Sequence, residues 1–386
     1  MFILSGRPIK YSDPWTRPLG DRLAALEKGH KRVAYFYERA DNSTFRYRVY
    51  NMVEALGQSG RDISAAYFFE REIDQLDAAV DIADALVICR SRYTNKLNRL
   101  ITRVQSKGKP VFFDVDDLIF DPDYIHLLLT TLDQKLKNPE SWDFWYARVG
   151  RIGATLRMCD RAIVTNDYLA SRVRHYADKP VSVVPNFLNE EQMEISRRIF
   201  EEKKVRQFAR NEEIHLGYFS GTPTHNKDFE IVSGTLAQLL QNDPRLRVRI
   251  VGFLDLKGPI RSYRSRFEFH PLSDFINLQR LIGEVEINLV PVQDNIFTNC
   301  KSELKYFEAG ITGTVTVASP IFTLANAIRD GENGFIANAF QWDEKLQCLL
   351  ENIDSYPLMA EKAFAHSDQN YCWENQVKLL ESTLFS

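Results

Sequence analysis

The chain has 386 residues, of which 44% are hydrophobic and 26% charged, so its composition is typical of globular proteins and disfavours disordered, collagen-like and coiled-coil structures. The 49 Lys and Arg residues nearly balance the 52 Asp and Glu residues, and the net charge of −3 argues against a dedicated nucleic-acid binder. At about 150 residues per domain, this length predicts two domains.

The cysteine pattern and the lack of long apolar runs both favour a location in the reducing cytoplasm. The five cysteines are an odd number without a close pair, which fits neither a disulfide framework nor a zinc knuckle. The apolar run 2–4 is too short for a signal peptide, and the uncharged stretch 309–328 is too polar to span a bilayer. We therefore expect a cytoplasmic protein.

From about residue 31, short apolar runs typical of buried strands alternate with longer runs of helical periodicity. In the first half the expected strands are 32–37, 85–89, 110–115, 161–165 and 181–184, and the expected helices are 45–56, 93–105, 142–159 and 167–176. Alternation of strand and helix predicts a parallel sheet that is covered on both faces.

The charged stretch 189–213 has no apolar strand and is expected to be a helical connector. Beyond it the alternation restarts, with expected strands 214–219, 246–251, 285–290 and 314–318, expected helices 228–242, 274–283, 302–309 and 324–329, and a last apolar segment 334–337. The terminal helix 373–384 has its own apolar face, which is expected to pack on the first domain.

These patterns predict an α/β protein with two Rossmann-like, doubly wound domains that face each other across a cleft, where the carboxyl ends of both sheets meet. The expected parts are an N-terminal extension 1–30, a first domain 31–185, a second domain 186–365 and a terminal helix 366–386.

The most informative segment, 297–310, directly follows an expected strand. Ser302 is a suitable N-cap, Glu303 falls in the first turn, and the free amides of that turn favour a phosphate. Lys301 and Lys305 add positive charge, each charge-assisted contact contributing roughly 1.5–3 kcal/mol. The segment therefore predicts an anion site.

One carboxylate extends this site. Glu308 lies six residues after Ser302, where it can accept hydrogen bonds from two ribose hydroxyls. The alternative for the whole segment is an ordinary capped helix with a solvated charged face.

The loop 217–228 is a second candidate, because its small residues, Gly221 among them, allow close backbone approach. His225 and Lys227 are placed to meet a diphosphate from the opposite side. Neither Gly-x-Gly-x-x-Gly nor Gly-Lys-Ser/Thr occurs here, which disfavours a nicotinamide enzyme and an ATPase. A plain connecting turn is the alternative.

A cluster of aspartates follows the expected strand 110–115. Asp114 and Asp116 can hold a divalent metal on a diphosphate, since hard cations prefer carboxylate oxygens. Alternatively, Asp116 or Asp117 binds acceptor hydroxyls or acts as a base, with one pKa raised by like-charge repulsion. An Asp-rich turn that caps the next helix is the third interpretation.

Two arginines open the expected helix 45–56. Cations at a helix start oppose its dipole, so Arg46 and Arg48 favour an anionic ligand in the cleft. A structural ion pair is the alternative for Arg48.

The segment 89–109 carries seven basic residues and no acidic one. Helical spacing aligns five of them as a basic stripe: Arg92, Lys96, Arg99, Arg103 and Lys107. Together with the aromatic-rich segment 142–161, the stripe suggests a peripheral contact with anionic lipid, and a solvated face is the alternative. The histidines show no metal-ligand spacing, and no Gly-x-Ser-x-Gly elbow supports a nucleophilic hydrolase.

In combination, these features resemble the GT-B glycosyltransferases, specifically the large retaining group of family 4 (glycosyl transferases group 1), which includes many bacterial polysaccharide and lipopolysaccharide enzymes. The matching segments are Val164-Thr-Asn-Asp-Tyr-Leu169, Val183-Val-Pro-Asn-Phe187, Ile214-His-Leu-Gly-Tyr-Phe-Ser-Gly221 with His225, and Lys301-Ser-Glu-Leu-Lys-Tyr-Phe-Glu-Ala-Gly310. The likeness runs from about residue 31 to the end of the chain, and Lys-Ser-x-x-Lys-x-x-Glu is its most specific element.

The resemblance implies transfer of a hexose or deoxyhexose from a nucleoside-diphosphate sugar to a hydroxyl of a glycan or lipid-linked acceptor, with retention and without a metal or other cofactor. On the donor side it implies that the Ser302–Leu304 amides and Lys301 hold the diphosphate, Glu308 the ribose, Phe269 and His270 the base, and His225 and Lys227 the leaving phosphate. On the acceptor side it implies Arg46, Arg48, Asp116 and Asp117. Metal independence removes the main support for a metal between Asp114 and Asp116.

The sequence departs from the family at one position. The family often has a second glutamate eight residues before the one that matches Glu308, and Cys300 stands there. Backbone groups near Thr298 and Asn299 are expected to contact the donor sugar instead. The same departure leaves open a catalytically silent protein of this fold that binds nucleotide sugars or acts as a scaffold.

Overall fold

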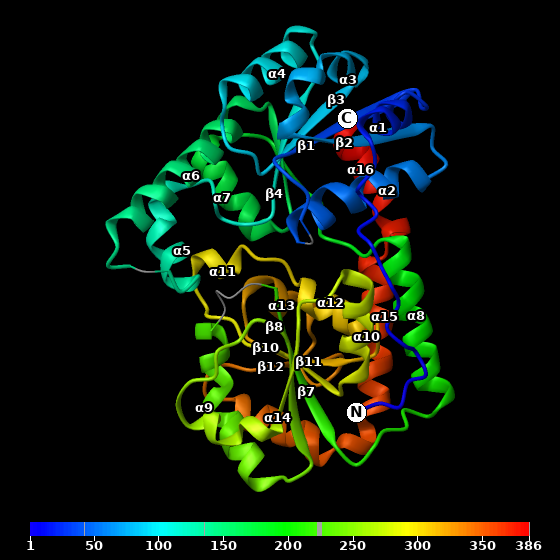
Figure 1. Ribbon diagram of the computed structural model, residues 1–386, viewed down its shortest axis with the longest axis vertical. Coiled ribbons are helices and arrows are strands. Elements are labelled where there is room, and N and C mark those ends of the chain that lie inside the picture. Colours follow the sequence, from blue (N-terminus) through cyan, green and yellow to red (C-terminus); the bar gives the residue numbers. More distant parts are fainter. Residues whose placement is uncertain (42, 135, 222–225, 386) are drawn as a thin grey trace.

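The computed structural model describes residues 1–41, 43–134, 136–221 and 226–385, and these residues form two α/β lobes (Figure 1). Each lobe is built on one six-stranded sheet in which every strand pair is parallel. The prediction of two Rossmann-like, doubly wound units is confirmed.

The first sheet has the strand order β2-β1-β3-β4-β5-β6. Its strands are β1 (Lys31–Tyr37), β2 (Ile63–Phe69), β3 (Ala85–Cys89), β4 (Val111–Val115), β5 (Arg161–Val164) and β6 (Val181–Val183). Its helices are α1 (Leu19–Leu26), a π-helix (Arg46–Tyr50) that continues into α2 (Asn51–Gln58), α3 (Asp77–Ile82), α4 (Asn95–Ser106), α5 (Ile125–Thr131), α6 (Pro139–Met158) and α7 (Asp167–Ala177).

Apolar residues lie on both faces of this sheet, because successive side chains of a strand point to opposite sides. Ala34 and Phe36 pack with α4, α6 and α7 on one face. Val33 and Tyr35 pack with α2 and the terminal helix on the other. Burial on both faces explains why the strands appear in the sequence as continuous apolar runs.

The second sheet has the order β12-β11-β10-β7-β8-β9. Its strands are β7 (Ile214–Ser220), β8 (Leu246–Gly252), β9 (Phe267–His270), β10 (Ile287–Val290), β11 (Val315–Ala318) and β12 (Phe335–Ile336). Its helices are α8 (Glu190–Val205), α9 (Asn226–Asn242), α10 (Phe275–Glu284), α11 (Ile296–Asn299), α12 (Leu304–Gly310), α13 (Phe322–Ala327), α14 (Trp342–Glu351), α15 (Tyr356–Tyr371) and α16 (Trp373–Phe385).

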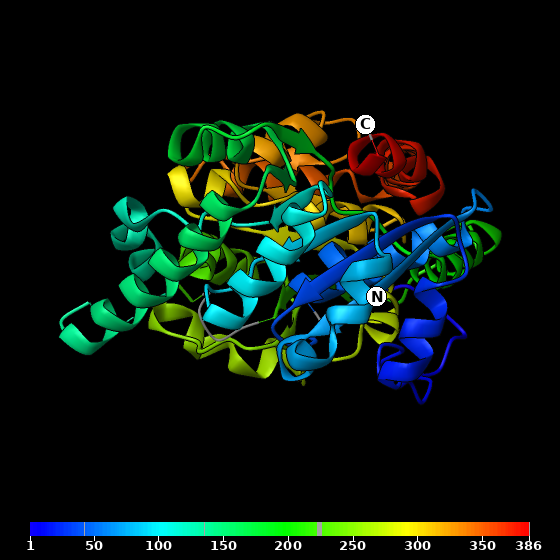
Figure 2. The same ribbon diagram turned by 90° about the horizontal axis from the view of Figure 1, so that it is seen from above.

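Both ends of the chain cross between the lobes (Figure 1). Helix α16 leaves the lower lobe and packs on α2 of the upper lobe, where Val377 and Leu380 are buried. The first residues cross in the same direction along the chain, since Phe2 is buried in the core of the second lobe and Trp15 in that of the first. In Figure 1 both crossings lie at the right of the view, beside α8 and α15, and Figure 2 shows the two ends from above. These crossings tie the two lobes together on that side.

No helix in the described parts of the chain is both long enough and apolar enough to cross a bilayer.

A buried lysine under the second sheet makes stability depend on pH. Lys203 is 1% exposed. Its amine donates to Gly313 O and Thr314 Oγ1 at 3.3 and 3.2 Å. Burial lowers the pKa of Lys203 to about 7, against the effect of Glu286. The unfolded chain therefore binds a proton that the folded chain lacks between about pH 7 and the ordinary lysine pKa of about 10.4.

We therefore expect the free energy of unfolding to rise with pH across this window, by up to about 1.4 kcal/mol per pH unit. The change Lys203→Met should flatten that rise. Urea unfolding of both proteins at several pH values above 7 measures the difference between their slopes. Parallel slopes would contradict the assignment.

Candidate active site

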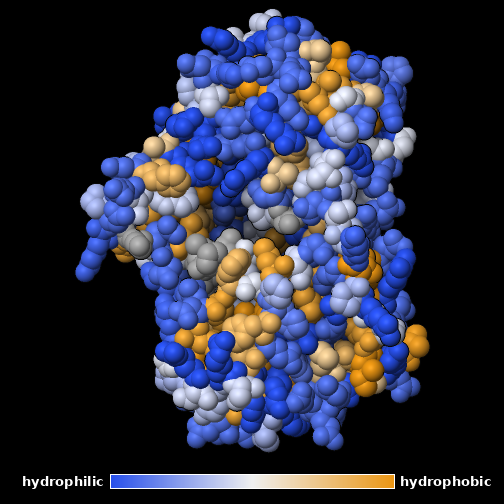
Figure 3. All heavy atoms as spheres, in the orientation of Figure 1, coloured by the Kyte–Doolittle hydropathy of each residue, from blue (hydrophilic) through white to orange (hydrophobic). Residues whose placement is uncertain are grey.

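The topology itself indicates where a ligand binds. In the first sheet the chain adds β2 on one side of β1 and β3 on the other, and in the second sheet β8 and β10 flank β7 in the same way. Ligands of open α/β sheets bind at the carboxyl ends of the strands at such switch points. A cavity of about 530 Å³ lies where the two switch points face each other. Figure 3 shows the surface hollowed between the two lobes.

The wall from the second lobe holds two lysines. Lys301 Nζ lies 3.5 Å from Asp117 Oδ1 of the first lobe and 5.0 Å from the Phe297 ring. Lys305 lies 5.3 Å from the centroid of the Tyr218 ring, and burial lowers the pKa of its amine. Ser302, Leu304 and Gly221 complete this side of the cavity.

The helix start differs from the prediction. Helix α12 begins at Leu304 after Glu303, and no side chain caps it, so Ser302 is not the N-cap. The Ser302 hydroxyl instead accepts a hydrogen bond from Asn186 Nδ2 at 2.9 Å. Glu303 does not line the cavity, and burial raises the pKa of its carboxyl. The backbone amides of Ser302 and Leu304 donate to no other described residue, as expected at the start of a helix.

The wall from the first lobe centres on Arg90, which follows β3 and has a φ of 44°. Its Nη1 donates to Asp116 Oδ1 at 2.9 Å and to Thr44 Oγ1 at 2.8 Å, and it lies 3.7 Å from Asp117 Oδ2. Burial acts to raise the pKa of Asp116, but Arg90 and Thr44 outweigh it and the pKa is lowered. Asp116 is therefore an ionised acceptor of hydrogen bonds.

The pKa of Asp114 is raised, whereas that of Asp116 is lowered. Burial raises the pKa of Asp114, against the effect of Arg48. The expected elevation by like-charge repulsion at Asp116 is thus wrong. Both oxygens of Asp114 accept hydrogen bonds from Arg48, and its buried side chain does not line the cavity beside Asp116. Among the described residues, no group of three or more Asp, Glu, His or Cys side chains is arranged for a metal. Asp121, by contrast, caps the next helical turn through Asp123 N.

Arg48 and Arg46 do not form an acceptor side. Arg48 is fully buried, and its Nε and Nη2 donate to Asp114 at 2.8 Å, so the structural ion pair is the correct interpretation. Arg46 is 4% exposed and donates to Glu308 Oε1 at 3.1 Å. The π-helix turns both side chains into the protein rather than into the cavity.

Glu308 is likewise enclosed. Its carboxylate accepts from Arg46 and from the Tyr47 hydroxyl, both of the first lobe, and it is 6% exposed. It does not line the cavity. A ribose contact at Glu308 therefore requires the Arg46 contact to open, and the contact stays a prediction.

Several other expected donor residues support the site or lie outside it. The Thr298 hydroxyl donates to Gln293 O, and Asn299 binds Asp294 and Phe322, so both order the loop before Lys301. Phe269 and His270 lie on the edge strand β9, apart from the cavity lining.

The loop after β7 is only partly described. Lys227 donates to Thr130 O at 2.9 Å and lies 3.7 Å from Asp133 Oδ1, so its charge is directed to the α5 side of the first lobe. His225 lies outside the described residues.

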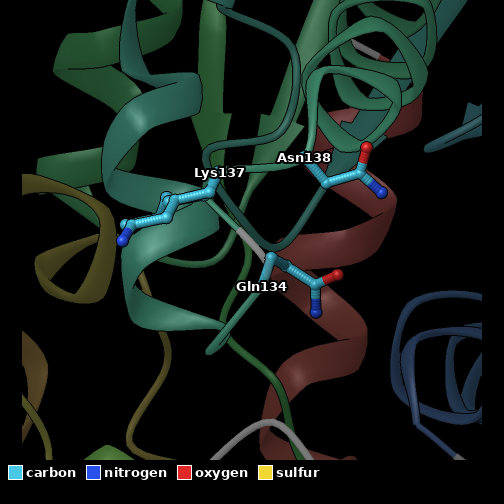
Figure 4. A pocket seen from close by; sticks show the side chains of 4 residues that line it. Gln134, Lys137 and Asn138 are labelled. Carbon is cyan, nitrogen blue, oxygen red and sulfur yellow. The ribbon is translucent and has the colours of Figure 1, made fainter.

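Several cavity residues were not predicted from the sequence, all of them polar or aromatic groups of the first lobe: Tyr37, Glu38, Arg39, Thr44, Arg90, Trp145 and Arg148. Four of them had a usable signal, because Glu38 and Arg39 follow β1, Arg90 follows β3, and Tyr37 ends β1. A smaller hollow beside the cavity is lined by Gln134, Lys137 and Asn138. In Figure 4 the side chain of Lys137 points to one side and those of Gln134 and Asn138 to the other.

The basic stripe on α4 is neutralised by acidic residues. Four of its five members form ion pairs: Arg92 with Glu38, Lys96 with Asp74, Arg103 with Asp77 and Asp81, and Lys107 with Asp81. The stripe therefore faces neighbouring carboxylates instead of offering a free cationic surface to lipid.

Two doubly wound sheets that face each other across a cleft at their switch points define the GT-B fold. No family model and no curated protein matches this chain. Among solved structures, it is similar to Anabaena HepE in complex with UDP and glucose (TM-score 0.62, 14% identity, 92% of this chain and 100% of that one). It is also similar to sucrose-phosphate synthase of Thermosynechococcus elongatus, with a TM-score of 0.61 and 13% identity over 91% of this chain and 97% of that one. A glycosyltransferase of Rickettsia africae is similar as well, with a TM-score of 0.57 and 12% identity over 92% of this chain and 98% of that one. At these identities the likeness establishes the fold, and the predicted GT-B architecture is confirmed.

Proposed function

We propose that this chain is a retaining, metal-independent glycosyltransferase that moves a hexose or deoxyhexose from a nucleoside-diphosphate sugar to a hydroxyl of a glycan or lipid-linked acceptor. We place it in the cytoplasm and in the biosynthesis of a bacterial surface polysaccharide. The observation that carries the proposal is the cavity between the two switch points, with cations on the second-lobe wall and carboxylates on the first-lobe wall.

The second-lobe wall suits the diphosphate of the donor. Lys301 and Lys305 supply positive charge, and the unpaired amides of Ser302 and Leu304 supply donors at the start of α12. When the bond between the sugar and the diphosphate breaks, negative charge builds on the departing phosphate. Groups that stabilise this developing charge lower the barrier.

The first-lobe wall suits a hydroxyl acceptor. Asp116 is ionised beside Arg90, and Asp117 lies beside Lys301, so carboxylate oxygens are available next to the expected diphosphate site. In the reaction the acceptor oxygen bonds to the anomeric carbon, the diphosphate leaves, and the hydroxyl proton is released with it. Arg46 and Arg48 have no part in this step, because both are buried in ion pairs.

Structures of similar fold support a uridine diphosphate donor as the first choice. HepE has been solved with UDP-glucose, TarM with UDP and alpha-GlcNAc-glycerol, and the O-GlcNAc transferase GtfA with UDP and GlcNAc. We therefore propose a UDP-sugar as the donor for this chain as well.

A product-release assay tests the function. The full chain is incubated with UDP-, GDP- and dTDP-sugars, with mixed glycan and lipid-linked acceptors, and the release of nucleoside diphosphate is measured. We expect release with one nucleotide series that is unchanged by EDTA. Loss of release in EDTA would contradict metal independence, and no release with any pair would contradict the transferase.

Cys300 motivates a second candidate, a catalytically silent binder of nucleotide sugars. Its Sγ is buried and contacts Ile296 O at 3.3 Å, at the position where the resembled family often has a glutamate. This candidate predicts that a nucleoside diphosphate raises the melting temperature while no acceptor leads to its release. The same assay therefore separates the two.

A further inference from the structure

Two arginines on the first-lobe wall of the cavity have no partner among the described residues. Arg39 follows β1 and Arg148 lies on α6, and both line the cavity. Within the described part of the chain, neither guanidinium donates a hydrogen bond to another residue or lies within ion-pair distance of a carboxylate. Their neighbours Arg90 and Arg92, by contrast, are each held by acidic side chains.

The surroundings of Arg148 leave its charge uncompensated. The nearest acidic influence is Glu38, but both Glu38 oxygens already accept hydrogen bonds from Arg92 at 2.8 Å. Burial lowers the pKa of Arg148, and Arg90 and Arg92 lower it further. The guanidinium still remains charged at any physiological pH. A partly desolvated cation that faces other cations is stabilised by an anion.

An aromatic side chain lies beside this cation. Trp145 precedes Arg148 by three residues on α6, and residues at this spacing share one helix face. Both line the cavity, and Trp145 is only partly buried. The indole offers an apolar face to a sugar ring, while Tyr37 and Asp41, which hydrogen bond to each other at 3.0 Å, lie on the same wall.

We infer that the first-lobe wall binds an acceptor with an anionic group, a sugar whose phosphate or carboxylate lies against Arg148 and Arg39 and whose ring packs on Trp145. This inference rests on the proposed function, because it identifies the class of acceptor. The donor diphosphate has its own cations, Lys301 and Lys305, on the opposite lobe. The two sets of cations therefore serve different anions.

Titration of the full chain with three small probes tests the inference: glucose 6-phosphate, glucuronate and uncharged glucose. With saturating UDP present, we expect at least one anionic probe to bind about tenfold tighter than glucose, as a charge-assisted contact allows. The two anionic probes distinguish a phosphate from a carboxylate. The change Arg148→Gln should abolish the preference, and it should leave the fold intact because Arg148 has no partner to lose.

The matched control is Arg99→Gln, which removes an exposed arginine of α4 that lies outside the cavity and pairs with no described residue, and it should change nothing. Equal affinities for charged and uncharged probes, or no binding of either anion, would overturn the inference. So would a loss of UDP affinity in Arg148→Gln, because the arginine would then serve the donor.

Repeating the titration without UDP separates this inference from the proposed function. An anion preference that depends on Arg148 in a chain that releases no nucleoside diphosphate from UDP-, GDP- or dTDP-sugars would uphold the anion site and reject the transferase. Turnover of a nucleotide sugar without any such preference would uphold the transferase and reject the anionic acceptor.

Discussion

Lys301→Ala is expected to lower kcat/KM for release of nucleoside diphosphate by about 100- to 1000-fold, the range seen when one donor to a developing negative charge is removed. Lys301 is the cation that reaches across the cavity, since its amine lies 3.5 Å from Asp117 of the first lobe. The side chain is only partly buried, so its removal should cost little stability. Initial rates with the preferred nucleotide sugar measure the effect.

Two further variants sharpen this prediction. Lys301→Arg keeps the charge and should recover part of the rate, although a planar guanidinium replaces a compact ammonium. Lys345→Ala removes another lysine of the second lobe, which pairs with Asp330 at 2.8 Å outside the cavity, and should leave the rate unchanged. A rate in Lys301→Ala close to that of the control would show that Lys301 on the second-lobe wall takes no part in the reaction.

The sheets were predictable because their strands are buried on both faces. The run 85–89 is a continuous apolar segment, and 111–115 is interrupted only by Asp114. The alternation with helices implies parallel pairing. Strand β9 (Phe267–His270) was not predicted, because it is a four-residue edge strand with a charged residue, Glu268, inside it. Strand β2 (Ile63–Phe69) was not predicted although it is wholly buried, because its alanines and serine weaken the apolar pattern of the sequence.

The cavity was predictable only where a site residue directly follows a strand or lies in one local motif. Asp116, Asp117 and Lys301 were found in this way, and all three line the cavity. Partners that are distant in the chain leave no trace in local spacing. Arg46 and Glu308 are 262 residues apart, and their pairing turns both side chains away from the cavity.

The pairing of Arg46 with Glu308 leads to the second large prediction, that Glu308→Ala destabilises the protein by about 3–5 kcal/mol. Arg46 is 4% exposed and pairs with Glu308, and its Nε and Nη1 have no hydrogen-bond partner among the residues that the structure describes. Aromatic rings of Tyr47 and Phe275 lie 4.2 and 5.1 Å from its Cζ and compensate only part of the charge. Urea unfolding of the variant and of the wild type measures the loss.

The control for stability is Glu381→Gln, which breaks exposed ion pairs with Lys31 and Arg61 and should cost less than about 1 kcal/mol. A small effect of Glu308→Ala would mean that water or a shifted side chain compensates Arg46. Glu308→Gln tests the charge alone, because an amide oxygen still accepts the hydrogen bond from the Tyr47 hydroxyl.

Glu308→Gln also decides whether the carboxylate has a second role toward ribose. If the Arg46 contact opens and Glu308 accepts from the ribose hydroxyls, the wild type should bind UDP about tenfold tighter than 2′-deoxy-UDP, since one charge-assisted hydrogen bond is lost. Glu308→Gln should then reduce this ratio toward one. If Glu308 only joins the lobes, the ratio of the UDP and 2′-deoxy-UDP affinities is the same in the wild type and in Glu308→Gln. The affinity for both nucleotides and the stability of the variant then fall together. Calorimetric titration with the two nucleotides therefore separates a positioning role from a contact with the donor, which unfolding data alone cannot do.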